Sequence, residues 1–331
     1  MRKTSGNILQ KTGKVLLAPL AGVADLAYRL IARELGAEFC FYEMADSHSL
    51  VLSAPKKNAD IHQDHPQDRP IAAQLLGPEA EIMYQAAKKL LALHPHSTFL
   101  DINAACPVKK VLKKKSGAYL IKEPDELFKI IDKLASKLKL PITVKLRAGY
   151  TKIDTKHIVK VAQGCVDSGA QALFVHGRTM SQLYHGEVDY ESIKAIKDNV
   201  KVPVYGSGNI FSPQDAKKMI DLTGCDGVLV ARGSFGNPWL FRNISNYLEN
   251  GELTAEPTLE QKLPVLRRHI QYIEKYKLLS PKAKVGFSRK IAVWYLKHFR
   301  NSAAIRTRVN KIVSFDELYC LIDELLQQQN R

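Results

Sequence analysis

One cysteine lies where a fold often places its chemistry, at the end of an apolar strand-like run and beside a dense group of lysines. Cys106 and Pro107 follow Ser97–Asn103, and five lysines fall within Val108–Lys115. A free cysteine is most often a small buried hydrophobic residue. A cysteine–proline pair at a strand end is a better candidate for chemistry, as a nucleophile or as a proton donor. No base for a nucleophile is adjacent in the sequence, so proton donation is at least as well supported.

Two further strand-like runs carry cations where apolar residues are expected. Lys145 interrupts an apolar run, and Arg147 shares its face because strand side chains alternate. A buried lysine needs an anionic partner or it loses its proton. A phosphorylated, electron-rich cofactor is one such partner, and an ion pair with Asp101 is the alternative. His176 alone would be interpreted as a core histidine, but its neighbour Arg178 favours a functional role.

Two glycine-rich turns favour a phosphate site. Gly206-Ser207-Gly208-Asn209 follows one run, and Ala231-Arg232-Gly233 follows the next. Glycine lets backbone N–H groups approach a phosphate closely, and the loops after the last two strands of an α/β barrel often bind one. Arg232 adds a cation. Two purely structural turns are the alternative, but their order along the chain favours a phosphate-bearing ligand.

These residues belong to, or closely follow, short apolar runs that predict strands buried on both faces. The eight runs are Val15–Gly22, Ala37–Met44, Ile71–Gly77, Ser97–Asn103, Ile142–Gly149, Gln171–Arg178, Val202–Asn209 and Cys225–Gly233. Helical patterns separate most of them, as at Asp25–Leu35, Pro78–Leu93, Pro124–Leu138 and Ser212–Leu222. The alternation predicts an α/β fold, an eight-stranded parallel (β/α)8 TIM barrel with its site at the carboxyl ends of the strands.

An open doubly wound sheet is the alternative fold. It would normally carry a Gly-x-Gly-x-x-Gly turn after the first strand, whereas this chain has Ala18-Pro19-Leu20-Ala21-Gly22 there. We therefore prefer the barrel. Its site would collect the residues that follow or end the strands, including Pro19, Leu20, Ala21, Gln74, Asn103, Cys106, Lys145, His176, Arg178, Ser207, Gly208, Asn209, Ala231 and Arg232.

The last quarter of the chain differs in pattern and in charge. A polar segment, Glu249–Glu256, precedes four helical patterns: Leu259–Tyr276, Lys282–Phe299, Ala303–Val313 and Phe315–Gln328. From residue 259 to residue 311 there are 14 Lys or Arg and only two Glu, so this part supplies a net +12 of the chain's +16. Such a density of cations suits phosphate backbones. The prediction is a barrel domain over residues 1–245 and a helical, basic, RNA-binding domain over residues 246–331.

Cysteine usage and hydropathy indicate the compartment. The five cysteines are widely spaced without a Cys-x-x-Cys pair, which argues against disulfides and a zinc site and for a reducing compartment. Besides Cys106 they are interpreted as buried apolar residues: Cys40, Cys165, Cys225 and Cys320. The start Met1–Asn7 superficially resembles a signal peptide, but Pro19 and Gly22 interrupt the apolar run. We expect a cytoplasmic protein without membrane or metal association, for which a monomer is adequate.

Taken in order, the motifs resemble those of the tRNA-dihydrouridine synthases, and most closely the bacterial B-type branch. The motifs are APLAGVAD, QLLG, DINAACPVKKVLKKKSGAYL, VKLRAG, HGRT, YGSGNI and ARGSFGNPW. They run through the whole predicted barrel, and the basic helical tail agrees with the RNA-binding domain of that family. The ordered set is specific, although no single motif would be.

The resemblance implies an FMN enzyme that uses NADPH, or NADH, to reduce the C5–C6 double bond of particular uridines in tRNA. It implies FMN contacts from Pro19, Leu20, Ala21, Gln74, Lys145, His176, Ser207, Gly208, Asn209, Ala231 and Arg232. Cys106 matches the catalytic cysteine, and Asn103 and Arg178 match positions near the substrate base. Two positions depart from the usual pattern. Ala105 replaces a glycine before Cys-Pro, and Ser207-Gly208-Asn209 replaces Asn-Gly-Asp.

The expected chemistry assigns separate roles to flavin and thiol. Hydride from reduced FMN would reach uracil C6 after the base leaves the RNA stack, and Cys106 would protonate C5 from the other face. Nearby cations favour a thiolate, so we expect the side chains of Lys109–Lys115 to point outward toward RNA phosphates, on a mobile loop that closes over the base. Two alternatives remain open: a flavin dehydrogenase of a free pyrimidine, and a non-catalytic RNA-binding barrel.

Overall fold

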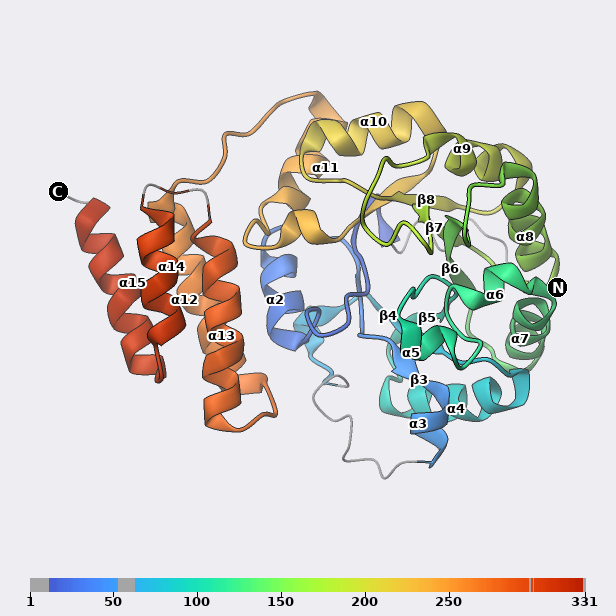
Figure 1. Ribbon diagram of the computed structural model, residues 1–331, viewed down its shortest axis with the longest axis horizontal. Coiled ribbons are helices and arrows are strands. Elements are labelled where there is room, and N and C mark those ends of the chain that lie inside the picture. The colour runs from blue at the N-terminus through green and yellow to red at the C-terminus, as the bar shows by residue number, and fades with distance from the viewer. Residues whose placement is uncertain (1–11, 53–62, 298, 300, 330–331) are drawn as a thin grey trace.

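The computed structural model describes residues 12–52, 63–297, 299 and 301–329. The start Met1–Asn7, compared above with a signal peptide, lies outside the described residues. The chain forms a ring of strands surrounded by helices, and a group of C-terminal helices stands to one side of it (Figure 1).

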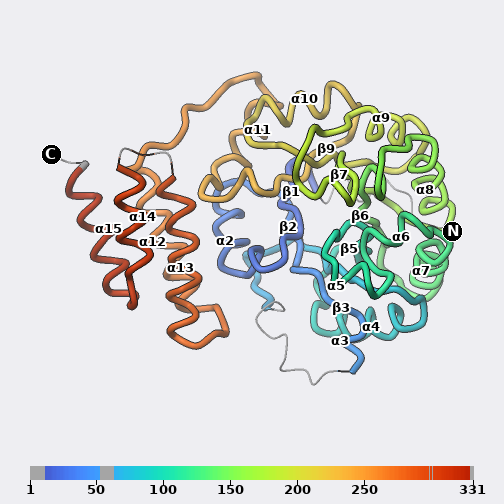
Figure 2. The backbone as a smooth tube through the Cα atoms, viewed as in Figure 1, coloured from blue at the N-terminus to red at the C-terminus, as the bar shows by residue number. Residues whose placement is uncertain are grey.

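The strands form a closed parallel barrel. Their order in the sheet is β1-β9-β8-β7-β6-β5-β4-β2, and the short β3 also pairs with β4. A bridge from Leu16 to Phe39, just before β2, closes the ring, which can be followed in Figure 2. The bounds are β1 Val15–Leu17, β2 Cys40–Phe41, β3 Ala45–Asp46, β4 Ile71–Leu76, β5 Ser97–Asn103, β6 Ile142–Gly149, β7 Leu173–Thr179, β8 Val204–Ser207 and β9 Gly227–Val230. The predicted barrel is confirmed, and closure excludes the open sheet.

Helices cover the outside of the barrel and form the C-terminal group. On the barrel they are α2 Leu26–Glu34, α3 Ser47–Leu52, α4 Ala80–Leu93, α5 Lys109–Leu112, α6 Tyr119–Lys122, α7 Pro124–Lys137, α8 Thr155–Asp167, α9 Tyr190–Asn199, α10 Pro213–Thr223 and α11 Leu240–Asn250, with short 3-10 turns η2 Pro66–Asp68 and η3 Arg232–Ser234. The C-terminal helices are α12 Leu259–Tyr276, α13 Pro281–Tyr295, α14 Ser302–Lys311 and α15 Phe315–Gln329.

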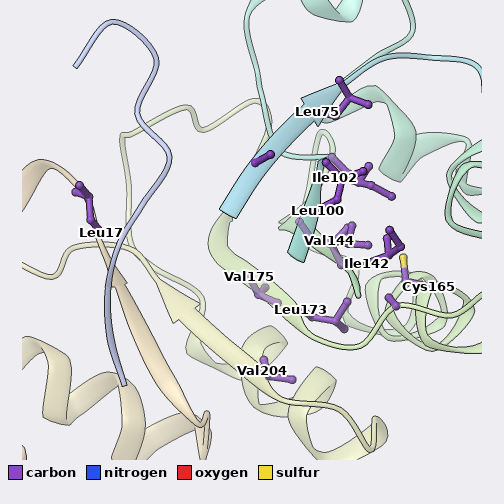
Figure 3. Close-up of a cluster of buried hydrophobic side chains, with 14 of the residues drawn as sticks. Leu17, Leu75, Leu100, Ile102, Ile142, Val144, Cys165, Leu173, Val175 and Val204 are labelled. Atoms are coloured by element: carbon purple, nitrogen blue, oxygen red, sulfur yellow. The ribbon is translucent and has the colours of Figure 1, made fainter. Parts of the chain in front are cut away.

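Successive side chains of a strand point to opposite faces of the sheet. The strands therefore contribute to two separate apolar layers, one inside the barrel and one outside it. Inside the barrel, Phe39, Phe99 and Phe174 pack together, with the first two stacked at 5.1 Å between ring centroids. Outside it, residues such as Leu100 and Val144 face the helices, and Figure 3 shows this layer. The strands are buried on both faces, which explains why most of them appear in the sequence as mainly apolar runs.

Several elements differ from the predicted bounds. β1, β8 and β9 are shorter than the apolar runs because their last residues turn into loops around the site. The short β3 and the helices α8, α9 and α11 had not been delimited from the sequence. Helix α11 runs through the expected domain boundary between residues 245 and 246, and the division of the chain into two domains stays a prediction.

The C-terminal helices have an apolar core of their own that also includes one helix of the barrel. Leu263, Leu266 and Ile270 of α12 belong to this core together with Ala27 and Ile31 of α2. Helix α12 begins with a capping box between Thr258 and Gln261, which stabilises helix starts. Helix α2 therefore joins the two parts, and its own N-terminus follows the loop after β1. No helix within the described ranges is long and apolar enough to cross a membrane.

Candidate functional site

A cavity of about 430 Å³ opens at the carboxyl ends of the barrel strands. Twelve of the predicted site residues line it: Pro19, Leu20, Ala21, Asn103, Cys106, Lys145, His176, Ser207, Gly208, Asn209, Ala231 and Arg232. Gln74 and Arg178 do not line it. The volume lies within the range typical of cofactor and small-molecule sites.

The loop that carries Cys106 is held by hydrogen bonds from several sides. Asn103 Oδ1 accepts from the backbone N–H of Ala105 at 3.0 Å and of Cys106 at 2.9 Å. Arg147 Nε donates to the Ala105 carbonyl at 2.8 Å, and the Cys106 carbonyl accepts from Ala118 N–H at 3.0 Å. These bonds fix the position of the thiol before any ligand binds. Ala105 is accommodated without a positive φ, so the methyl group at this position leaves the loop unstrained.

The thiol of Cys106 is held in its protonated form. Cys106 is 8% exposed. Burial raises the pKa of its thiol above the ordinary value, although Arg147 and Lys145 act in the opposite direction. The lysines that follow the cysteine are exposed to solvent, which screens their charge: Lys109 and Lys110 lie on helix α5, where a loop was expected, and Lys113–Lys115 lie in the turn after it. The structure therefore resolves the conflict between a lysine-rich segment and a proton-donating cysteine.

Gln74 lies one layer behind the cavity in a buried polar chain. Its Nε2 donates to Asp101 Oδ2 at 2.7 Å, and its Oε1 accepts from Asn103 Nδ2 at 2.8 Å. Thr143 Oγ1 donates to the other oxygen of Asp101 at 2.6 Å. Burial raises the pKa of Asp101 to about 6, with these hydrogen bonds opposing the rise. Gln74 thus orients Asn103, and through it the backbone of the cysteine loop.

Lys145 lines the cavity without a direct ion pair among the described residues. No carboxylate of the described residues lies within 4.0 Å of its Nζ, and both oxygens of Asp101 are engaged elsewhere. Burial, followed by repulsion from Arg147, lowers the pKa of Lys145 to about 8. A direct Lys145–Asp101 ion pair is therefore not formed, although Asp101 attracts the ammonium group at longer range and partly opposes the fall in its pKa. The ammonium group is left available to an anionic ligand.

His176 faces the same cavity from β7 as a neutral imidazole. Burial lowers the pKa of this ring well below its ordinary value, and Lys145, Arg147 and Arg178 lower it further. A neutral ring can donate one hydrogen bond and accept another. His176 is therefore suited to hydrogen bonding with a polar ligand rather than to carrying positive charge.

The two glycine turns meet at one side of the cavity. Gly208 has φ +131°, a value that only glycine adopts readily, and a Cβ on Gly233 would collide with the Ile210 carbonyl. Asn209 has φ +51°, which asparagine tolerates better than most residues. Its Oδ1 accepts from Arg178 Nη2 at 3.0 Å. At this position an amide oxygen therefore accepts the hydrogen bond from Arg178, whereas the motif pattern described above has an aspartate there.

Arg178 supports a neighbouring loop from behind the cavity. The residue is 1% exposed, and its Nε donates to the carbonyls of His185 and Gly186 at 3.0 and 3.1 Å. Its Nη1 is buried and has no acceptor among the described residues. Contact between Arg178 and a substrate base stays a prediction.

Several cavity residues were missed or left unassigned by sequence reasoning. Arg147 shares the face of Lys145, which the strand alternation indicated, but its role in holding the cysteine loop depends on tertiary contacts. Tyr184 and Phe211 are about half exposed and flank the guanidinium of Arg232, with ring centroids 4.7 and 5.7 Å from its Cζ. Both lie in loops, where no periodic pattern marks them.

The remaining cysteines are buried with one exception. Cys40, Cys165 and Cys225 are buried as predicted, whereas Cys320 is exposed. The prediction for Cys320 is wrong because α15 buries the helical face that carries Leu318, Leu321, Ile322 and Leu325, and Cys320 falls outside that stripe. Within the described part of the chain, no cluster of His, Cys, Asp or Glu is arranged to hold a metal ion.

The fold and the cavity together define an α/β-barrel enzyme with its site at the carboxyl ends of the strands. A family model described as dihydrouridine synthase (Dus) matches residues 16–330. The chain belongs to the dihydrouridine synthase family.

Relatives match along nearly the whole chain. The tRNA-dihydrouridine synthase B of Pasteurella multocida is 33% identical over 304 residues, covering 92% of this chain and 90% of that protein. That of Escherichia coli K12 is 32% identical over 309 residues, covering 93% and 94%. Among solved structures, histamine dehydrogenase from Rhizobium sp. 4-9 is similar in fold, with a TM-score of 0.55 at 12% identity, covering 79% of this chain and 49% of that one.

Proposed function

We propose that this protein is a flavin-dependent tRNA-dihydrouridine synthase that reduces the C5–C6 double bond of uridines in tRNA. The observation that carries the proposal is a buried cysteine on a loop held by backbone hydrogen bonds, in the same cavity as Lys145 and two glycine turns. Membership of the dihydrouridine synthase family supports the reaction, and the names of the bacterial relatives support tRNA as the substrate.

The chemistry of the cavity fits FMN. Gly208, Gly233 and Arg232 would receive a phosphate, because the two turns bring backbone and a guanidinium to one place. Lys145 has no direct ion pair and would pair with the electron-rich part of the ring system. His176 and the Pro19–Ala21 backbone would contact the rest of the flavin, and Asn103 would lie near the substrate base. NADPH or NADH would serve as the reductant.

The protein's own residues would position the cysteine loop and supply the proton. When bound and reduced, the flavin supplies hydride to uracil C6. Asn103 and Arg147 hold the cysteine loop, so that Cys106 Sγ can deliver its proton to C5 as negative charge develops there. Burial keeps that proton on sulfur at neutral pH. Closure of the Lys109–Lys115 segment over the base would exclude water from the transfer.

Affinity for FMN should fall as the pH rises through about 8. Below this pH the free protein carries a charged Lys145, whose pKa is lowered to about 8, and above it the amine is neutral and attracts an anion less. The expected result is a Kd for FMN that is flat from about pH 6.5 to 7.5 and increases above about pH 8. Titration of the apoprotein by flavin fluorescence measures this. A pH profile that is the same in Lys145→Met would contradict it.

The lysine segment and the basic helices would form the RNA-binding surface. Replacing Lys109, Lys110 and Lys113 with glutamine should weaken tRNA binding and lower the slope of log K against log salt by about 2–3, because each phosphate contact contributes about 0.7–0.9. The matched control replaces the exposed Lys137, Lys139 and Lys201 at the other end of the barrel. Equal slopes in the two triple variants would refute a role for the lysine segment.

The proposed function is tested by incubating purified protein with FMN, NADPH and tRNA that lacks dihydrouridine. The expected products are oxidised NADPH and tRNA in which uridine has gained two hydrogens, detected by mass spectrometry of the nucleosides. Reduction of free uracil or uridine but not of tRNA would instead support a pyrimidine dehydrogenase. Protein that neither binds flavin nor oxidises NADPH would support a non-catalytic barrel.

A further inference from the structure

The loop between β1 and α2 forms one wall of the cavity. Lysine side chains of the C-terminal helices hold this loop by a hydrogen bond and an ion pair. Pro19, Leu20, Ala21 and Val23 of this loop line the cavity. The carbonyl of Gly22, in the middle of the loop, accepts from Lys290 Nζ of α13 at 3.0 Å.

The same peptide segment is held from the barrel side. Gly22 N–H donates to Glu43 Oε2 at 2.5 Å, and Glu43 is 7% exposed. Gly22 has φ +71°, a conformation that glycine adopts without strain. A carboxylate from the barrel and an ammonium group from the helical bundle therefore fix the two sides of one residue in the cavity wall.

A second lysine of the bundle holds the end of the loop. Lys277 Nζ pairs with Asp25 Oδ2 at 2.7 Å, and the two residues are 7% and 3% exposed. Asp25 Oδ1 in turn caps α2 by accepting from Tyr28 N–H at 2.9 Å. The pair thus fixes the point at which the cavity loop becomes helix α2.

Aromatic rings lie against the ammonium groups of both lysines and hold them in place by cation–π contacts. The Nζ atoms of Lys277 and Lys290 each lie 4.2 Å from the ring centroid of Phe287, and Lys290 also lies 5.2 Å from that of Trp294. Trp294 stacks on Phe235 with ring centroids 4.3 Å apart. Phe235 itself lines the cavity, so the bundle reaches the site through rings as well as through the loop.

We infer that Lys277 and Lys290 are positioning residues of the ligand site, and that the C-terminal helices complete the flavin cavity in addition to providing a basic surface. Both lysines belong to the cation-rich stretch that suggested RNA binding, yet Lys277 is buried against Asp25 and is unavailable to a phosphate. The C-terminal helices α12–α15 therefore contact the loop that forms this wall of the cavity directly. This inference rests on the proposed flavin function, which supplies the ligand for the wall.

The test compares two lysines of the same helix. Lys290→Met keeps the apolar stem and removes the bond to the Gly22 carbonyl, whereas Lys282→Met removes an exposed charge. We expect the Kd of the apoprotein for FMN to increase about threefold to tenfold in Lys290→Met and to be unchanged in Lys282→Met. Lys290→Arg should restore binding because arginine can donate to the same carbonyl and lie over the same rings.

A second variant tests the loop end without leaving a buried charge unpaired. Lys277→Met combined with Asp25→Asn removes the ion pair while asparagine retains the cap of α2. We expect weaker FMN binding and an altered visible circular dichroism of the bound flavin, with a thermal melt confirming a folded protein. Equal FMN affinity and equal spectra in the wild type, Lys290→Met and this double variant would overturn the inference. Failure of the wild type to bind FMN would instead overturn the proposed function.

Discussion

Replacing Cys106 with alanine should lower the rate of uridine reduction by a factor of about 10²–10⁴, the usual contribution of a positioned general acid. Flavin binding and flavin reduction by NADPH should stay normal, because Lys145, His176 and the glycine turns are untouched. The loss arises from the missing proton at C5, since the loop is held through its backbone and through Asn103 rather than through the thiol. Stopped-flow measurements of the two half-reactions separate the steps.

The matched control for this variant is Cys320→Ala. Cys320 is also a cysteine, but it is exposed on α15 and takes no part in the site. Its replacement should leave both half-reactions at the wild-type rate. A Cys106→Ala protein that reduces tRNA as fast as the wild type would show that another group supplies the proton.

Replacing Lys145 with methionine should weaken FMN binding about 10-fold to 100-fold. A hydrogen bond to a charged group contributes about 1.5–3 kcal/mol, and 1.4 kcal/mol corresponds to a factor of ten in affinity. No carboxylate of the described residues forms a direct ion pair with this amine, and Asp101 attracts it only at longer range. Fluorescence titration of the apoprotein measures the Kd.

Lys152→Met serves as the control for Lys145, because Lys152 is exposed in the loop after the same strand. It should bind FMN with wild-type affinity. Unchanged affinity in Lys145→Met would mean that the flavin does not contact this amine. The pH dependence proposed above should also disappear in Lys145→Met, which links the two measurements to one group.

The strands could be predicted well because a parallel barrel buries both of their faces. The predicted bounds Ser97–Asn103 and Ile142–Gly149 coincide with β5 and β6, since each is a short, mainly apolar run rich in β-forming residues. The runs around β1, β8 and β9 were predicted too long. Their final residues, such as Pro19–Ala21 and Ala231–Gly233, continue the runs without a break in the sequence, yet they form loops that line the cavity.

The site was predictable as far as the strand ends determine it. Cys106, Lys145 and the two glycine turns converge because all carboxyl ends of a parallel barrel lie on one side. Gln74 also lies on a strand, yet its side chain ends in hydrogen bonds with Asp101 and Asn103 behind the cavity. Strand alternation gives only the face on which a side chain lies, and neighbouring side chains decide whether it reaches a ligand.

Contributions from distant segments could not be predicted from spacing. Tyr184 and Phe211 reach the cavity from irregular loops, and Phe235 does so beside Trp294 of the C-terminal bundle. Lys277 and Lys290 contribute to the basic composition of the tail, which in the sequence indicates only a charged surface. Their contacts with Asp25 and Gly22 depend on how the bundle packs against α2, and no local pattern encodes that arrangement.

The central claim is that a protonated Cys106 and the hydride donor act on opposite faces of one uracil ring. The most direct test runs the reaction in deuterated water with NADPH deuterated at the transferred position, and determines the stereochemistry of the dihydrouridine by proton NMR. Both new hydrogens are then deuterium, whatever exchange takes place at the flavin, and the account predicts that the deuterium atoms at C5 and C6 lie on opposite faces of the ring. Addition of both to the same face would contradict it.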